Sequence, residues 1–294
     1  MSDFVQDRKL PVMATVSEVL GGSFLHFFNL ISIAWFPLIL LFGVSLGAVY
    51  VTPTMVDPAA LNPSDMGEFL GIALVAQIVQ AFLYTMIAVV WHRRVLLGEN
   101  PTGPIYLKFG KREIFFILYL LLIGVFAFVI VGGAFGLTFA TASVGGGLIG
   151  TVILPVGYIL FMFVYLRSIL VLPAVAVSQS KPLRTSWAIT RGNCWRLFWG
   201  FFLIGLVALI VFAIVFIITG LVSGGGELGV QEYLKIFSEK SDMSTIMTFQ
   251  VTSMVFSVYF MMVGITYLSV CYRHLSGDVN AATDAEAVFG EEKL

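Results

Sequence analysis

The chain has 294 residues, of which 59% are hydrophobic and 11% are charged, and its mean hydropathy is +0.99. A soluble domain cannot cover its surface with polar groups from such a composition, so this class of protein is excluded. The sixteen lysines and arginines are balanced by seventeen acidic residues, which gives a formal net charge of −1, and we expect no nucleic-acid partner.

Six apolar runs recur along the chain, each about twenty residues long and therefore able to cross a hydrocarbon core of about 30 Å as a helix. They cover residues 28–51, 70–91, 114–138, 147–170, 197–222 and 247–271. None has the strict alternation of a membrane barrel. The sequence therefore predicts an all-α polytopic membrane helix bundle with six transmembrane helices over residues 1–275, followed by an acidic, flexible tail over 276–294.

Basic residues divide unevenly between the two sides of this predicted bundle. Fourteen of the sixteen lie before the first run, after the last run, or in the second and fourth connections, and only Lys235 and Lys240 lie opposite. The positive-inside tendency then places both termini in the cytoplasm, and we expect a bacterial inner membrane protein. The first 20 residues show no cleavage site, so the first helix is expected to act as an uncleaved insertion signal.

One motif occurs three times. Each odd-numbered run follows an amphipathic stretch, a glycine (at positions 22, 110 and 192) and an aromatic-rich segment, and each even-numbered run ends near Arg93, Arg167 or Arg273. One interpretation is a threefold hairpin repeat, over 12–100, 101–180 and 181–275, in which every hairpin begins with an interfacial helix on the cytoplasmic face. The alternative is chance similarity, because aromatic and basic residues gather at membrane interfaces for physical reasons.

The best-defined interfacial helix is predicted over residues 182–191. Pro182 suits its first turn, Gly192 can end it in the left-handed conformation, and Asn193 is expected to cap the next helix. Such a helix should hold its tryptophan at the level of the lipid head groups and its arginines among the phosphates of anionic lipids. The candidate lipid-binding or interface-binding residues are Arg93, Arg94, Arg167, Arg184, Trp187, Arg191, Trp195 and Arg196.

Arg167 has apolar sequence on both sides. We expect it to extend toward the head groups while residues 169–177 bend at Pro173 and lie half-immersed in the membrane. If the hairpins pack in a ring, Glu18 or Glu113 is its expected ion-pair partner.

No catalytic, cofactor-binding or metal-binding residues are predicted. No ionisable side chain lies in the middle of any apolar run, and the three histidines have no metal-ligand spacing. The polar side chains inside the runs are uncharged, and the main ones are Gln77, Gln80 and Gln250. Hydrogen bonds between helices are the favoured interpretation of these residues, and a polar path for a solute is the alternative.

The connection between the fourth and fifth runs also carries a resemblance. The positions concerned are Leu172, Pro173, Ala174, Ser186, Trp187, Thr190, Arg191, Gly192, Asn193, Trp195, Arg196 and Leu197. In these the chain resembles bacterial multi-pass membrane families of uncharacterised function, including the membrane domain associated with glycerophosphodiester phosphodiesterases. The stretch after the sixth run, GDVNAATDAEAVFGEEKL, is too short for a catalytic barrel, so the resemblance implies no phosphodiesterase activity for this chain.

These observations favour a non-enzymatic inner-membrane protein that binds anionic lipids or membrane-protein partners, as a homo-oligomer or in a larger complex, with a scaffold or assembly role in the envelope. A permease or flippase for a small amphiphile is the first alternative. A membrane-embedded enzyme of lipid metabolism is the second.

Overall fold

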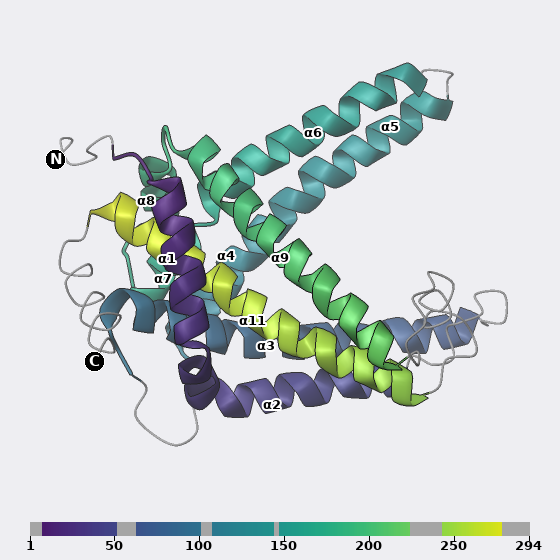
Figure 1. Ribbon diagram of the computed structural model, residues 1–294. Coiled ribbons are helices and arrows are strands. Elements are labelled where there is room, and N and C mark those ends of the chain that lie inside the picture. Colours follow the sequence, from purple (N-terminus) through teal and green to yellow (C-terminus); the bar gives the residue numbers. More distant parts are fainter. Residues whose placement is uncertain (1–7, 52–62, 101–107, 144–146, 224–242, 278–294) are drawn as a thin grey trace.

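The computed structural model describes residues 8–51, 63–100, 108–143, 147–223 and 243–277, and these residues form helices and no strand (Figure 1). The elements are α1 (Val12–Leu25), α2 (Phe27–Val51), α3 (Pro63–Leu97), α4 (Lys111–Ala127), the π-helical turn η2 (Phe128–Gly132), α5 (Gly133–Ser143), α6 (Gly147–Ser168), α7 (Val171–Ala176), α8 (Pro182–Ile189), α9 (Cys194–Ser223) and α11 (Met243–Ser276). Within the described residues, six helical stretches are long and apolar enough to cross a membrane. The predicted all-α, six-span architecture is confirmed.

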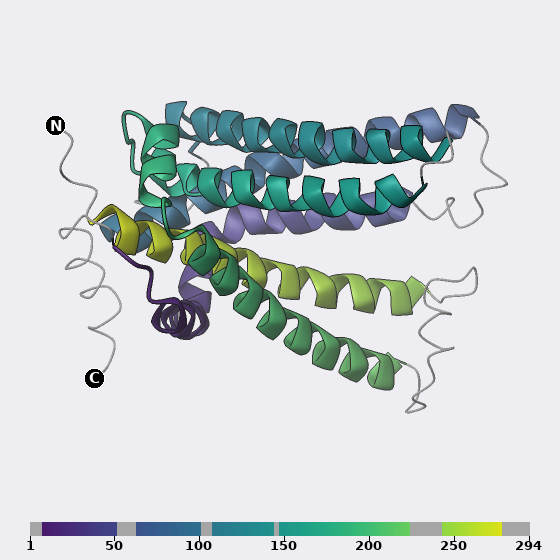
Figure 2. The same ribbon diagram turned by 90° about the horizontal axis from the view of Figure 1, so that it is seen from above.

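The spanning helices form three hairpins, which meet at one end of the molecule and diverge toward the other (Figures 1 and 2). The hairpins are α2 with α3, the continuous α4–η2–α5 helix with α6, and α9 with α11. The two described ends of the chain and the short helices α1, α7 and α8 lie where the hairpins meet. Because Arg93, Arg167 and Arg273 lie near the ends of α3, α6 and α11 there, we call this the basic end.

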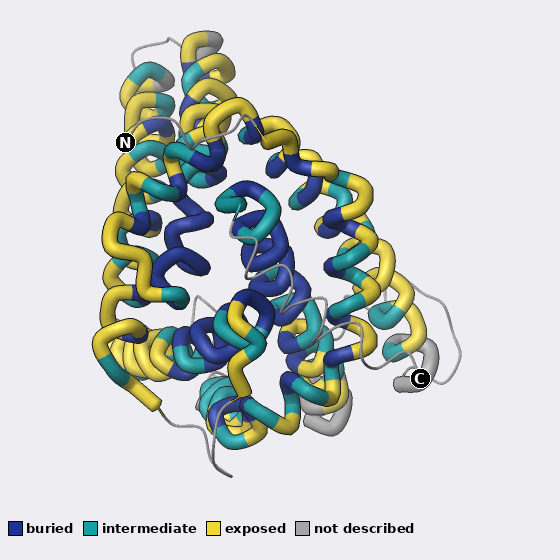
Figure 3. Tube along the Cα trace, turned by 90° about the vertical axis from the view of Figure 1, so that its left-hand side faces the viewer, coloured by how far each residue is buried: buried dark blue, intermediate teal, exposed yellow. Residues whose placement is uncertain are grey.

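Burial is concentrated at the basic end (Figure 3). All six residues of α7 are buried, as are most residues in the last three turns of α3 and of α11. Most of α9 is exposed along the rest of its length, and the side chains it exposes there are almost entirely apolar. Protein packing therefore holds the basic end together, and the diverging parts of the hairpins present apolar faces suited to lipid.

The structure corrects the prediction for residues 169–177. These residues were expected to lie half-immersed in the membrane, but α7 is enclosed by α3, α4, α8 and α11. Its end is a Schellman motif in which the N–H of Ser178 donates to the Val175 carbonyl (2.9 Å) and the N–H of Gln179 to the Ala174 carbonyl (3.0 Å). Ser178 occupies the left-handed position, with φ of 62°, where glycine is the usual residue.

The arginines at the basic end anchor the short helices. Arg273 forms an ion pair with Glu18 of α1, and Arg167 Nη2 donates to the Trp187 carbonyl of α8 (2.6 Å). The expected pairing of Arg167 with Glu18 or Glu113 is wrong, because Glu18 binds Arg273 and Glu113 Oε2 accepts the N–H of Gly110 (2.7 Å). Tertiary contacts, which charge counting does not reveal, decide these partners.

The two helices α1 and α8 each begin one hairpin and pack on the last spanning helix of another, α1 on α11 and α8 on α6. This relation is the one expected of repeats arranged in a ring. The corresponding stretch of the second hairpin includes residues 101–107, which lie outside the described residues. The division of the chain into repeats therefore stays a prediction.

Asn193 has a different role from the one predicted. Gly192 is left-handed as expected (φ 75°), but the Asn193 side chain does not cap α9. Its Oδ1 accepts the N–H of Leu10 (3.0 Å) and its Nδ2 donates to the Arg8 carbonyl (2.7 Å). An amide side chain offers a donor and an acceptor together, so it can hold an extended backbone segment against the start of α9.

Replacing Asn193 with alanine should destabilise the protein by about 1.5 kcal/mol, because two largely buried backbone groups lose their partners. Thermal unfolding in one detergent, compared with wild type, measures the effect. Ser32→Ala, at an exposed hydroxyl bonded only within its own helix (2.9 Å), is the control and should change little. If both variants unfold at the same temperature, the attachment of residues 8–10 to α9 contributes no stability.

Candidate functional site

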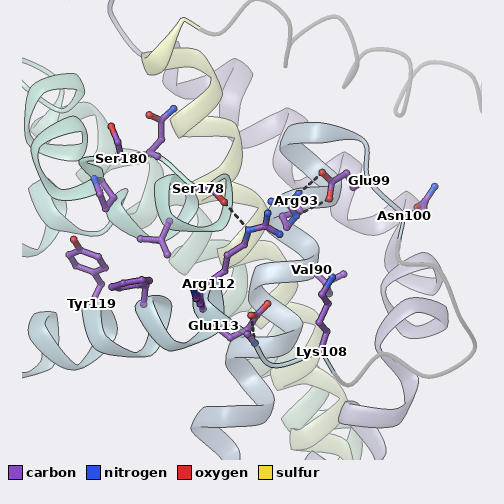
Figure 4. A pocket seen from close by; sticks show the side chains of 16 residues that line it. Val90, Arg93, Glu99, Asn100, Lys108, Arg112, Glu113, Tyr119, Ser178 and Ser180 are labelled. Atoms are coloured by element: carbon purple, nitrogen blue, oxygen red, sulfur yellow. Dashed lines mark hydrogen bonds and ion pairs between the residues drawn. The ribbon is translucent and has the colours of Figure 1, made fainter.

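A cavity of about 930 Å³ lies at the basic end, between the end of α3, the start of α4 and the turn that joins α7 to α8 (Figure 4). It combines three segments that are far apart in the sequence. The basic residues among those that line it are Arg93, Lys108, Lys111 and Arg112, and the acidic ones are Glu99 and Glu113. Among the described residues that line the cavity, four cations against two carboxylates give a formal charge of +2.

Both carboxylates already have partners within the protein. Glu99 forms an ion pair with Arg93, whose Nε donates to Glu99 Oε2 (2.8 Å) and whose Nη1 donates to the Ala176 carbonyl (2.8 Å). Glu113 is buried and accepts the N–H of Gly110, the residue that precedes α4. Because the Arg93–Glu99 pair is neutral and the N–H of Gly110 carries no formal charge, Glu113 offsets one of the remaining three cations and two are left without a counter-charge.

These three cations retain free donors. Lys108 and Lys111 are exposed and have no hydrogen bond or ion pair with a described residue. Arg112 Nε donates to Ser178 Oγ (2.8 Å), and its terminal nitrogens have no partner in the described parts of the chain. The first N–H groups of α4 lie beside them and add to the positive potential. The arrangement can bind an anion.

The cavity also has an apolar part. Phe115 and Tyr119 on α4, with Val90 and Val175, line it alongside the basic residues. Arg112 and Tyr119 are seven residues apart on one helix, which corresponds to about 10 Å along its axis. The lining thus changes from cationic near the start of α4 to apolar further along the helix, as a site for an amphiphile would.

The structure separates the predicted lipid-binding residues into three groups. Arg93 lines the cavity. Four others contact the protein itself. Arg94 lies over the Trp91 ring (6.0 Å), and Arg167 lies over the Trp187 ring (4.7 Å). Trp187 Nε1 donates a hydrogen bond to Ser168 Oγ (3.2 Å), and Arg196 Nη1 donates one to the Leu10 carbonyl (2.9 Å). The remaining three, Arg184, Arg191 and Trp195, are exposed.

The three glutamines of the alternative polar path are not joined by hydrogen bonds in the described residues. Gln80 Nε2 makes a long contact with Ser45 Oγ (3.4 Å), Gln77 is exposed, and the Gln250 carbonyl accepts from Ser253 (2.9 Å). The cavity begins at Val90, about 20 Å along α3 from Gln77. The prediction of a polar path gains no support from this arrangement.

Sequence reasoning missed Lys108, Lys111, Arg112 and Ser178 as site residues. The three cations were counted only as charges that orient the bundle. Their signal was the run KFGKRE, in which a glycine precedes a helix start and basic residues flank it. The left-handed backbone of Ser178 has no signal in the sequence.

In the described residues, no group of three or more histidines, cysteines or acidic residues could hold a metal ion.

Comparison with models of protein families gives a match. The model of a family described as the membrane domain of glycerophosphoryl diester phosphodiesterase matches residues 139–288. These 150 residues (139 to 288 inclusive) are half of the 294 in the chain, and they include α6 to α11. Neither the curated proteins nor the solved structures gave a match.

Proposed function

Since the chain belongs to the family of membrane domains of glycerophosphoryl diester phosphodiesterase, we propose that it is a non-enzymatic protein of the bacterial inner membrane that binds anionic phospholipids. The basic end faces the cytoplasm in this proposal, and α1 and α8 lie at the level of the head groups. Lipid binding serves a scaffold or assembly role in the membrane.

The cavity at the basic end is the observation that carries the proposal. Its uncompensated cations match a lipid phosphate, and Phe115 and Tyr119 match the apolar part of the same molecule. Each basic residue near an anionic surface contributes about 1 kcal/mol to lipid binding. Lys108 and Lys111 are expected to contribute most, because they have no hydrogen bond or ion pair with a described residue that a lipid would have to replace.

Replacing Lys108 and Lys111 together with glutamine should reduce retention of phosphatidylglycerol about thirtyfold, because the loss of two cations near the phosphate removes about 2 kcal/mol. Native mass spectrometry of protein released from mixed phosphatidylcholine and phosphatidylglycerol bilayers measures the number of lipids retained.

The matched control replaces Arg184 and Arg191 with glutamine. These residues are exposed, lie at the same end outside the cavity, and carry the same total charge. The control should lose much less lipid than the lysine variant. Equal losses would place lipid binding on the whole basic surface rather than in the cavity, and no loss from either variant would contradict the proposed function.

A further inference from the structure

We propose that the cavity selects the doubly negative phosphomonoester head group of a lipid such as phosphatidic acid over a phosphodiester head group, which carries a single charge. This inference rests on the proposed function, because it takes the occupant to be a lipid.

Charge balance is the first argument. The described residues of the lining carry four cations and two carboxylates, a net +2. A phosphomonoester carries about −1.5 to −2 at pH 7. A phosphodiester such as phosphatidylglycerol would leave one cation of the site without a counter-charge.

The number of acceptor atoms is the second argument. A phosphomonoester presents three terminal oxygens, whereas a phosphodiester presents two. The available donors are the two lysine ammonium groups and the terminal nitrogens of Arg112, and a guanidinium can bind two phosphate oxygens at once. Three cationic side chains can therefore each contact a charged oxygen of a monoester.

Ser178 supports this arrangement as a positioning residue. Its left-handed backbone disfavours any residue with a Cβ, yet its hydroxyl accepts from Arg112 Nε (2.8 Å). The bond ties α4 to the buried end of α7 and leaves the terminal nitrogens of Arg112 as its remaining donors. The site is thus partly organised before a head group arrives.

The apolar part of the lining indicates a lipid rather than a soluble phosphate. Phe115 and Tyr119 continue the cavity along α4, beyond the basic residues. A free phosphate would leave these side chains without a partner, whereas the glycerol and the first acyl carbons of a lipid can cover them.

The test compares two guest lipids in nanodiscs of phosphatidylcholine. Phosphatidic acid or phosphatidylglycerol is added at the same mole fraction, and native mass spectrometry measures the guest retained. We expect phosphatidic acid to be retained about fivefold more, which is the effect of one additional exposed charge. Lys108→Gln with Lys111→Gln should abolish the preference, and Arg184→Gln with Arg191→Gln should leave it unchanged.

Glu99→Gln provides a second variant that leaves the cations intact. It raises the net charge of the lining from +2 to +3 and releases Arg93 from its ion pair, so retention of phosphatidic acid should increase. A decrease would contradict the charge-balance argument.

The possible failures are distinguishable. Equal retention of the two guest lipids by the wild type would overturn the preference and leave the proposed function standing. Retention of neither would overturn the proposed function. Displacement of phosphatidic acid by millimolar glycerol 3-phosphate would overturn the assignment of a lipid and show that the site takes a soluble phosphomonoester.

Discussion

Replacing Gly200 with alanine should lower the stability of the protein by about 3 kcal/mol, because the new methyl group would enter space that Tyr267 occupies. An added Cβ would overlap Tyr267 Oη and lie 2.8 and 2.9 Å from two of its ring carbons. The ring cannot move aside easily. It is fully buried, its hydroxyl donates to the Leu197 carbonyl (2.9 Å), and it packs edge-on against Phe201.

Gly205→Ala is the matched control, on the same helix. A Cβ at Gly205 would meet nothing within 4 Å, so only helix propensity changes, in favour of alanine by up to about 1 kcal/mol. Thermal unfolding of both variants in the same detergent tests the difference. Similar melting temperatures would show that α9 and α11 do not approach each other at Gly200 and Tyr267.

The spanning helices could be predicted from the sequence because the thickness of a bilayer sets the length of each apolar run. Their ends could not be predicted as well. The second run was placed at 70–91, but α3 continues to Leu97, where Gly98 ends it in the left-handed conformation (φ 65°). Charged side chains such as Arg93 mark the edge of the membrane without ending a helix, so hydropathy and helix length report different boundaries.

The candidate site was harder to predict, because its parts come from three separate segments. Charge counting found that Lys108 and Arg112 lie on the same side as Arg93, but not that they line one cavity. The sequence likewise does not show that the apolar stretch that includes Val175 packs against other helices, so this stretch was assigned to the membrane surface. A short apolar helix has the same composition in lipid as inside a protein, and only the packing of α7 distinguishes the two.

Replacing Glu18 with glutamine should destabilise the protein by about 2 kcal/mol at neutral pH. Arg273, which is only 10% exposed, would lose the carboxylate that neutralises it. The full cost of breaking a buried ion pair is about 3–5 kcal/mol, but Glu18 is itself 36% exposed, so solvent screening reduces the effect. His274 Nε2, 3.4 Å from Glu18 Oε2, would lose the same partner.

The pair should also make stability depend on pH. Burial raises the pKa of Glu18, but the hydrogen bond with His274 and the positive charge of Arg273 outweigh burial and hold the pKa below its ordinary value. A carboxyl whose pKa is lower in the folded protein stabilises it above the ordinary value, about 4.3, and loses this contribution as the pH falls through the lowered value. Acidification below about pH 4 should therefore remove the contribution of the Glu18 charge from the wild type, whereas the glutamine variant has no carboxyl at this position to titrate.

Thermal unfolding at pH 7 and at a series of values below pH 5 compares the wild type with Glu18→Gln and with Glu99→Gln. The second substitution breaks the Arg93–Glu99 pair, in which the carboxylate is 50% exposed, and should cost less than about 1 kcal/mol. The difference between wild type and Glu18→Gln should be largest at neutral pH and shrink as the pH falls. A difference that stays constant across this range would mean that Glu18 supports α1 through packing or neutral hydrogen bonds and not through its charge.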